Sequence, residues 1–222
     1  MTRPRLLDLF CGAGGAGMGY HRAGFGVVGV DINPQPRYAG DEFHQADAMT
    51  FPLDGFDAVH ASPPCQDHSP LARTSGIHGT GWMLHATVER LSESGLPFVV
   101  ENVAGADLPG ALVLCGSEFG LEDGPFALKR HRKFVSNVFL LGAGGCTCAA
   151  GKEIIGVYGD LSANDRRSGR KGEARRLRAG VDRARRLMGM PWANARELTQ
   201  AIPPAYTQFI GEQLLESLAV NA

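Results

Sequence analysis

The sequence lacks any apolar run that approaches the roughly 20 residues a helix needs to span a bilayer, and its amino terminus lacks the apolar stretch of a signal peptide. Its five cysteines form an odd set without the regular spacing of a disulfide framework. These absences predict a soluble protein of the reducing cytoplasm that makes no contact with a membrane.

An excess of either charge is also missing. The chain has 22 Lys and Arg residues and 23 Asp and Glu residues, which gives a formal net charge of −1. The molecule as a whole is therefore not a polycation, and a surface for nucleic acid requires basic residues that are gathered locally. Such a concentration lies between Asp165 and Arg186, and it is a candidate surface for phosphate contacts.

The composition is that of a folded domain. Of the 222 residues, 44% are hydrophobic and 20% are charged, which is enough for one substantial core. A buried strand is expected over residues 6–10, a helix after it that ends near Gly24, and a second strand over residues 26–30. This order of elements predicts an α/β fold with a parallel sheet.

A glycine-rich turn joins the first strand to the first helix. Glycines bring the backbone close to a ligand, and the start of a helix offers free N–H groups, so cofactors with a nucleotide part bind there. The second strand ends at Asp31, where a carboxylate can accept hydrogen bonds from ribose hydroxyls. Asp47 could lie beside the same pocket, at the end of a third strand or turn, but its position is the only indication. At this point both a dinucleotide oxidoreductase and an S-adenosylmethionine methyltransferase remain open.

Cys65 is a candidate nucleophile. It follows a predicted strand over residues 56–60 and two prolines that fix the approach of the backbone. A helix over residues 82–94 then leads to a buried strand, residues 97–103, that contains Glu101. Successive parallel strands often pair, so the cysteine and the acid are expected at the same edge of the sheet. A lone cysteine is more often a small buried hydrophobe, so the neighbouring motifs decide its role.

Three motifs together resemble one family. Asp8–Gly15, Pro63–Gln66 and Glu101–Val103 are similar, in order and spacing, to the cofactor loop, nucleophile and acid motifs of the cytosine-5 DNA methyltransferases. The resemblance implies a Rossmann-like S-adenosylmethionine-dependent methyltransferase fold, with a mostly parallel sheet and helices on both faces. It implies methyl transfer from S-adenosylmethionine to carbon 5 of a cytosine that is flipped out of duplex DNA.

The resemblance also implies the site residues. The catalytic residues would be Cys65, Glu101, Arg130 and Arg132. The cofactor would be bound by Phe10, Gly12, Ala13, Gly14, Asp31, Ile32, Asp47 and Pro64. The substrate would be bound by Pro63, Gln66, Ser69 and Asn102. In this scheme Cys65 attacks carbon 6 of cytosine, and Glu101 shares a proton with ring nitrogen 3.

The two arginines alternate around His131. On an extended segment this spacing places Arg130 and Arg132 on one face, where they suit a cytosine carbonyl or a phosphate, and His131 on the opposite face, at the surface. The family commonly has glutamine where Leu128 stands, and asparagine where Gln200 stands in the closing motif.

The organisation along the chain follows from the same motifs. Residues 1–141 are predicted to form the catalytic and cofactor-binding core, residues 142–180 a reduced target-recognition segment, and residues 181–222 a return segment with the closing helix. A recognition segment this short reads few base edges. We expect low sequence specificity, a very short target or help from an accessory protein.

Cys146 and Cys148 stand one residue apart and could be half of a metal site. No second pair follows them in the sequence, so two loop thiols and no bound metal are expected.

Other functions remain open. The same chemistry could act on RNA or on a free cytosine nucleotide, and the same fold could serve a non-catalytic protein that binds DNA or a partner. The oxidoreductase alternative gives no function to the prolines, Cys65 or Glu101. The target sequence, the oligomeric state, the base that removes the carbon 5 proton and the biological setting, such as restriction and modification, are not determined.

Overall fold

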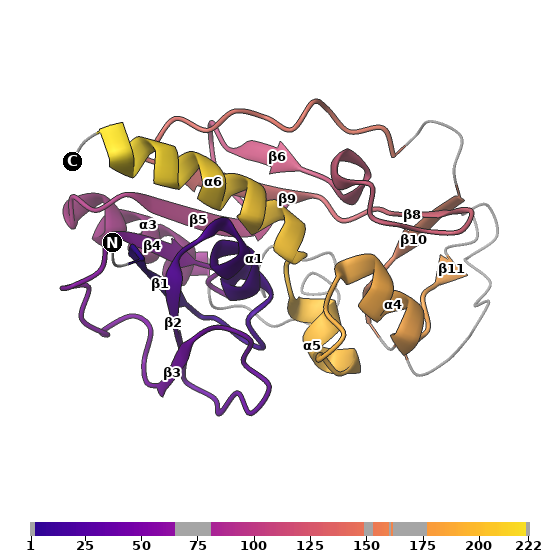
Figure 1. The fold of residues 1–222 in the computed structure, drawn as a ribbon, viewed down its shortest axis with the longest axis horizontal. Coiled ribbons are helices and arrows are strands. Elements are labelled where there is room, and N and C mark those ends of the chain that lie inside the picture. The colour runs from indigo at the N-terminus through magenta and orange to yellow at the C-terminus, as the bar shows by residue number, and fades with distance from the viewer. Residues whose placement is uncertain (1–2, 65–80, 149–152, 160, 162–176, 221–222) are drawn as a thin grey trace.

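The computed structural model describes residues 3–64, 81–148, 153–159, 161 and 177–220 (Figure 1). Its main sheet has the strand order β3-β2-β1-β4-β5-β9-β6. The strands are β1 (Arg5–Leu9), β2 (Gly26–Asp31), β3 (Glu42–Gln45), β4 (Ala58–Ala61), β5 (Phe98–Val103), β6 (Leu112–Leu114) and β9 (Arg132–Ser136). Neighbouring strands from β3 to β5 pair in parallel, and β9 runs antiparallel to both β5 and β6. The predicted mostly parallel α/β sheet is confirmed.

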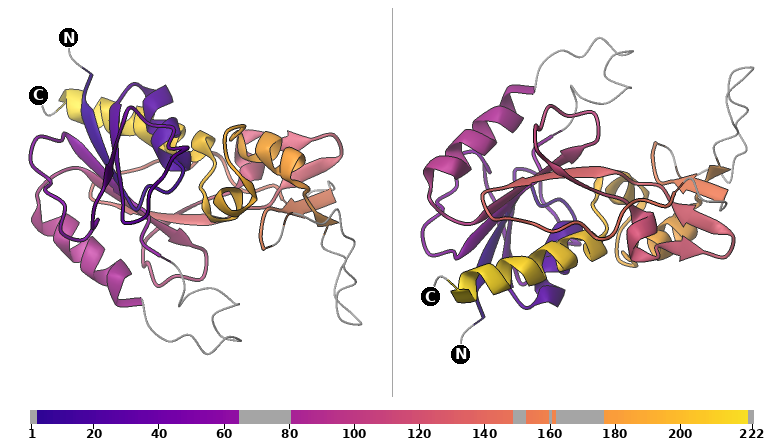
Figure 2. Two further views of the ribbon diagram at one scale, coloured as in Figure 1. Left: turned by 90° about the horizontal axis from the view of Figure 1, so that it is seen from below. Right: turned by 90° about the horizontal axis from the view of Figure 1, so that it is seen from above.

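Helices cover both faces of this sheet. Helices α1 (Gly15–Ala23) and α6 (Pro204–Val220) lie on one face, and α3 (Gly81–Glu93) lies on the other (Figure 2). Alternate strand residues point to opposite faces. Leu6, Val27 and Val99 therefore join a core with α1 and α6, whereas Leu7, Val28 and Val100 join a second core with α3.

The apolar residues over positions 134–141 predict a strand, but β9 ends at Ser136. The next residue, Asn137, closes the edge of the sheet with its side chain. Its Oδ1 accepts a hydrogen bond from the Phe98 amide at 2.9 Å, and its Nδ2 donates to the Leu96 carbonyl at 2.9 Å. The amide side chain thus replaces the next pair of strand hydrogen bonds.

A second, smaller sheet has the order β11-β10-β8-β7. Its strands are β7 (Glu122–Asp123), β8 (Phe126–Leu128), β10 (Glu153–Gly156) and β11 (Leu177–Arg178). The sheet shares a third core with α4 (Val181–Met188) and α5 (Ala195–Gln200), while the short 3-10 helix η1 (Gly116–Phe119) precedes β7. Since β7 and β8 precede Gly142, this substructure begins before the predicted recognition segment.

A tyrosine fills the space beside the cofactor loop. The Tyr38 ring, from the loop between β2 and β3, lies against Gly14, Gly17 and Gly29, and a Cβ on Gly29 would overlap it. The same loop is held from the other side, since the Arg37 guanidinium makes a bidentate ion pair with Glu197 of α5, with Nη2 to Oε1 at 2.8 Å. These glycines therefore serve packing as well as the turn.

In the part of the chain described, no helix is both long and apolar enough to cross a bilayer.

Candidate active site

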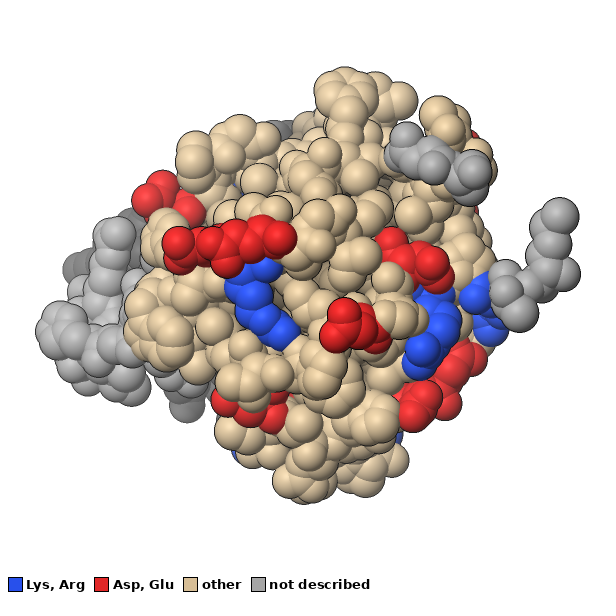
Figure 3. Space-filling model, turned by 90° about the vertical axis from the view of Figure 1, so that its left-hand side faces the viewer, with Lys and Arg blue, Asp and Glu red and all other residues tan. Residues whose placement is uncertain are grey.

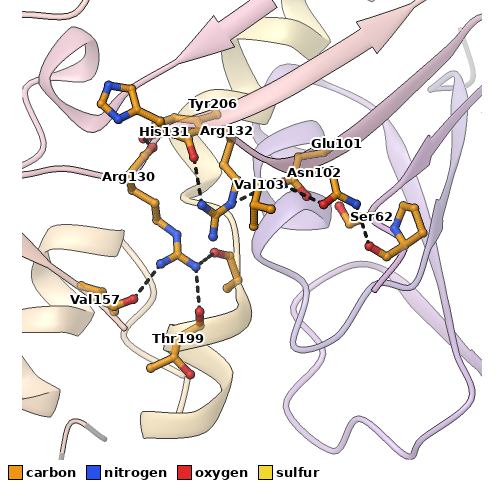
Figure 4. A network of polar contacts seen from close by, with 12 residues as sticks. Ser62, Glu101, Asn102, Val103, Arg130, His131, Arg132, Val157, Thr199 and Tyr206 are labelled. Atoms are coloured by element: carbon orange, nitrogen blue, oxygen red, sulfur yellow. Dashed lines mark hydrogen bonds and ion pairs between the residues drawn. The ribbon is translucent and has the colours of Figure 1, made fainter. Parts of the chain in front are cut away.

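The candidate site lies where parallel strands end. β1, β2, β4 and β5 are in register, so the loops that follow them meet at one edge of the sheet. This edge brings together the glycine loop, Asp31, Pro63 and Glu101, as the order of the predicted strands requires. Figure 4 shows the part of the site around Glu101 and the two arginines.

The glycine loop has the backbone of a ligand cradle. Phe10 has a φ of 59°, a left-handed conformation that non-glycine residues rarely adopt, and Gly12 has a φ of 50°. The Gly12 amide donates to Asp31 Oδ2 at 3.1 Å, and Trp192 Nε1 donates to the Ala13 carbonyl at 2.9 Å. A Cβ on Gly12 would meet no atom within 4 Å, so open space adjoins this residue.

Three further residues predicted to bind the cofactor follow neighbouring strands: Asp31 ends β2 next to the glycine loop, Ile32 comes after it, and Asp47 comes after β3. Asp31 is half-buried and also accepts from the Asn33 amide, at 2.9 Å to Oδ1. The Ile32 side chain is 68% exposed and presents an apolar surface to solvent. Asp47 is exposed, and its Oδ1 accepts from the Met49 amide at 2.9 Å. Both carboxylates keep lone pairs that a ligand can use.

The chain leaves β4 at Ser62, three residues before the predicted nucleophile Cys65. Cys65, Gln66 and Ser69 lie outside the described residues, which on this side end with the buried Pro63 and the exposed Pro64. The Asn102 side chain donates from Nδ2 to the Pro63 carbonyl at 3.1 Å, and its Oδ1 accepts from the Val103 amide at 2.9 Å. Asn102 therefore ties the backbone at Pro63 to the end of β5.

Glu101 is buried next to this tie. Its side chain pairs with Arg132, with Nε 2.9 Å from Oε1, and each side chain is only 7% exposed. Desolvation raises the pKa of Glu101, whereas Arg132, Arg130 and a hydrogen bond from the Ser62 hydroxyl act in the opposite direction. The net effect is a carboxyl group that holds a proton more readily than an exposed glutamate, as a proton donor requires.

The structure adds residues that the motifs did not indicate. Tyr20 and His60 are fully buried, with the Tyr20 hydroxyl 2.9 Å from His60 Nδ1, and His60 Nε2 lies 2.9 Å from Ser62 Oγ. Burial lowers the pKa of His60 to about 3, so the ring is neutral. One tautomer of His60 then satisfies every hydrogen bond in this row of side chains. Tyr20 donates to Nδ1, Nε2–H donates to Ser62, and Ser62 donates to Glu101. The one signal for this arrangement in the sequence was His60, a polar residue in an otherwise apolar strand.

Arg130 does not face the site with a free guanidinium. Its side chain is fully buried, and it donates to three carbonyls: Val157 at 2.7 Å, Thr199 at 2.9 Å and Ala201 at 2.5 Å (Figure 4). Arg130 thus binds the protein's own backbone in this structure, and its contact with cytosine or phosphate stays a prediction. Its hydrogen bonds join the segment between the two sheets to the chain directly after β10 and to the end of α5. Of the two arginines, Arg132 is the one that pairs with Glu101.

Replacing Arg130 by methionine is expected to lower the free energy of unfolding by about 3–5 kcal/mol, because three buried carbonyls lose their donors while the volume is nearly kept. Urea unfolding followed by circular dichroism measures this loss. Arg186→Met is the control, since Arg186 is 59% exposed where it pairs with Asp123, and a pair of this kind contributes about 0–1 kcal/mol. A stable Arg130→Met variant that has lost activity would instead support a substrate contact.

Asp8 of β1 is a further buried acid beside the glycine loop. Burial raises its pKa to about 8, although the Gly17 amide acts in the opposite direction. The carboxyl group of the folded protein is therefore protonated at neutral pH. In the unfolded chain an aspartate ionises near about pH 4.

We expect the Asp8→Asn variant to gain stability over the native protein as the pH rises. The raised pKa stabilises the native fold fully below about pH 4, and this contribution is lost as the pH rises toward about 8. Asparagine has no proton to lose, so the difference in Tm should grow across this range and then level off. Thermal unfolding at a series of pH values measures it, with Asp107→Asn at an exposed position as the control. Parallel Tm curves would contradict the expectation.

The basic stretch after Asp165 is only partly described. Arg183 and Arg186 both pair with Asp123, at 2.8 and 3.0 Å, and Arg185 pairs with Asp182 at 3.2 Å. On the face where both termini lie, basic side chains stand beside acidic ones among mostly neutral residues (Figure 3). The other basic residues of this stretch lie outside the described residues, so the expected phosphate-contacting surface stays a prediction.

The amino-terminal half of the chain is similar in sequence to known proteins. Residues 4–108 match the family model of the C-5 cytosine-specific DNA methylases. The type II methyltransferase M.AquIA of Picosynechococcus sp. is 33% identical over 122 residues, which cover 46% of this chain and 49% of that protein. The type II methyltransferase M.XorII of Xanthomonas oryzae pv. oryzae is 32% identical over 126 residues, which cover 47% of this chain and 29% of that protein. The chain thus spans half or less of the length of these curated relatives.

Solved structures share the fold over nearly the whole chain. The Dnmt2 methyltransferase of S. pombe superposes with a TM-score of 0.63 at 15% identity, covering 98% of this chain and 99% of that one. The methyltransferase EhMeth of Entamoeba histolytica gives a TM-score of 0.58 at 10% identity, covering 98% and 99%. The fold is therefore the Rossmann-like fold of the S-adenosylmethionine-dependent methyltransferases. Within this class, residues 4–108 are similar to the C-5 cytosine-specific DNA methylases.

Proposed function

We propose that the protein transfers a methyl group from S-adenosylmethionine to carbon 5 of cytosine in DNA, through a covalent bond between Cys65 and carbon 6. The observation that carries the proposal is the buried ion pair of Glu101 and Arg132. Glu101 directly precedes Asn102, whose side chain binds the Pro63 carbonyl. This arrangement places an acid with a raised pKa next to the start of the nucleophile loop. The class of reaction is proposed from the similarity of residues 4–108 to the C-5 cytosine-specific DNA methylases.

The residues of the cradle fit the cofactor. Open space beside Gly12 leaves room for a ligand against the backbone, and the exposed Ile32 offers an apolar surface to an adenine ring. The Asp31 carboxylate would accept hydrogen bonds from the ribose hydroxyls, and Asp47 from the adenine amino group. When bound, the cofactor supplies an electrophilic methyl group.

The reaction needs a nucleophile and a proton donor on one cytosine ring. The Cys65 thiolate would form a bond to carbon 6, and electron density would move toward ring nitrogen 3, where the Glu101 carboxyl group gives or shares its proton. Carbon 5 would then take the methyl group, which leaves S-adenosylhomocysteine. Loss of the carbon 5 proton to a base, departure of the thiolate and return of the proton from ring nitrogen 3 to Glu101 would restore the ring. Arg132 would keep the Glu101 carboxyl group oriented throughout.

The substrate class is the finer part of the proposal. Carbon 6 is not accessible inside a duplex, so the cytosine would be flipped out, at a cost of a few kcal/mol. Gln66 and Ser69 are the proposed contacts to the base or backbone near Cys65. An accessory protein could supply base contacts that the short segment 142–180 does not provide.

Assays with the native protein and S-adenosylmethionine labelled in the methyl group test the proposal. Label is expected in carbon 5 of cytosine of duplex DNA, identified after digestion to nucleosides. Transfer only to RNA or to free cytosine nucleotides would change the substrate class and leave the proposed reaction unchanged. No transfer to any of the three substrates would favour a non-catalytic binding protein.

A further inference from the structure

Four metal-binding side chains that are scattered in the sequence meet in the fold. Cys115 follows β6, His131 precedes β9, and Cys146 and Cys148 lie in the chain after β9. β6 and β9 are antiparallel with Leu114 opposite Arg132, so the next residues, Cys115 and His131, are neighbours across the pair. The three sulfur atoms and one ring nitrogen all lie within 4.8 Å of one another. The spacing of Cys146 and Cys148 alone did not reveal these partners.

We infer that Cys115, His131, Cys146 and Cys148 form a tetrahedral zinc site that holds the Arg130–Arg132 segment in place. His131 Nε2 lies 3.3 Å from Cys146 Sγ and 3.9 Å from Cys148 Sγ. Bonds of about 2.3 Å to sulfur and about 2.0 Å to nitrogen place the ligand atoms of tetrahedral zinc roughly 3.5–3.8 Å apart. The four side chains thus stand close to the required separations.

The donor set selects the kind of metal and the kind of site. Three sulfur ligands and one imidazole suit zinc, whereas Mg²⁺ and Ca²⁺ require oxygen ligands. Four protein ligands fill a tetrahedral shell, as in structural zinc sites, and leave no position for a reacting water. The site therefore has a structural role and takes no part in the methyl transfer itself.

The surrounding hydrogen bonds already hold the ligand loops together. The Cys148 amide and the Ser117 hydroxyl donate to Cys146 Sγ, at 3.4 and 3.6 Å. The Glu118 carboxylate accepts from the Cys115 amide at 2.6 Å and from the Gly145 amide at 3.2 Å, and so joins two ligand-bearing segments. Outer contacts of this kind orient metal ligands and stabilise the charge on thiolate sulfur.

The position of His131 gives the site its consequence. In Figure 4 the His131 ring points away from the guanidinium groups of Arg130 and Arg132. The His131 carbonyl accepts from Arg132 Nη1 at 2.9 Å, and the Arg130 carbonyl accepts from the Tyr206 hydroxyl at 2.6 Å. A metal bound to His131 would fix the backbone between the two arginines from the side opposite Glu101. The consequence for Arg132, which would be held in position beside Glu101, rests on the proposed function. The metal site itself does not.

Metal analysis of the full-length chain, purified under reducing conditions without chelator, tests the site. We expect about one zinc ion per chain in the native protein and in Cys11→Ser, whose buried cysteine lies outside the cluster, and a loss of most of the zinc in Cys146→Ser. Since a variant can lose zinc by misfolding, the native chain is also stripped of metal and titrated with Co²⁺. Intense thiolate-to-cobalt absorption that saturates at one Co²⁺ per chain is the expected result.

Two outcomes would overturn the site. One is a native chain without zinc whose Co²⁺ titration gives no thiolate absorption, and the other is an intact mass that shows a disulfide among the three cysteines under the same conditions. These readouts need no methyl transfer, so a failed methylation assay leaves them unaffected. Equally, the absence of zinc would not contradict the proposed reaction.

Discussion

Replacing Cys65 by serine is expected to abolish the proposed methyl transfer. A serine hydroxyl is almost entirely protonated at neutral pH, whereas a cysteine supplies a thiolate, which is the stronger nucleophile by far. The described residues show where the chain leaves the sheet on its way to Cys65. Asn102 holds the Pro63 carbonyl at 3.1 Å, and Glu101 precedes Asn102 on β5, so the chain leaves the sheet beside the proposed proton donor.

The same methyl-transfer assay measures the effect of Cys65→Ser, and cofactor binding by isothermal calorimetry serves as its control. The cofactor cradle is built from β1 and β2, so the variant should bind S-adenosylmethionine with an unchanged Kd. A variant that binds the cofactor and still methylates cytosine at the native rate would contradict the covalent mechanism.

Replacing Glu101 by glutamine should lower kcat by roughly 10²- to 10⁴-fold, the usual contribution of a positioned acid or base. Glutamine keeps the size of the side chain but has no carboxyl proton to share with ring nitrogen 3. It also places a neutral group 2.9 Å from the buried Arg132 guanidinium, so the variant should be less stable as well. Single-turnover rates at saturating DNA isolate the catalytic effect.

Glu212→Gln makes the same chemical change at an exposed position of α6 and should leave the single-turnover rate unchanged. Thermal unfolding of both variants shows whether the Glu101→Gln protein is folded under the assay conditions. A folded Glu101→Gln protein with a native single-turnover rate would show that another group protonates the ring.

Local pattern accounts for most of the fold that could be predicted. Strand residues such as Leu6 and Val99 alternate or form short apolar runs, and the glycines after Phe10 mark a tight turn, so these elements can be read from neighbours in the sequence. The end of β9 at Ser136 could not be read this way, because the competing hydrogen bonds of Asn137 reach Phe98 and Leu96, which lie 39 and 41 positions earlier.

The sequence by itself determined the strand–helix order, the glycine loop and the motifs around Pro63 and Glu101, because each is a property of adjacent residues. Only the tertiary structure decided that Arg130 is turned inward onto three carbonyls and that Cys115 and His131 face Cys146 and Cys148. Both arrangements depend on strand pairing and on contacts between distant segments. Their energies come from burial and from hydrogen bonds that exist only once the two sheets are packed together.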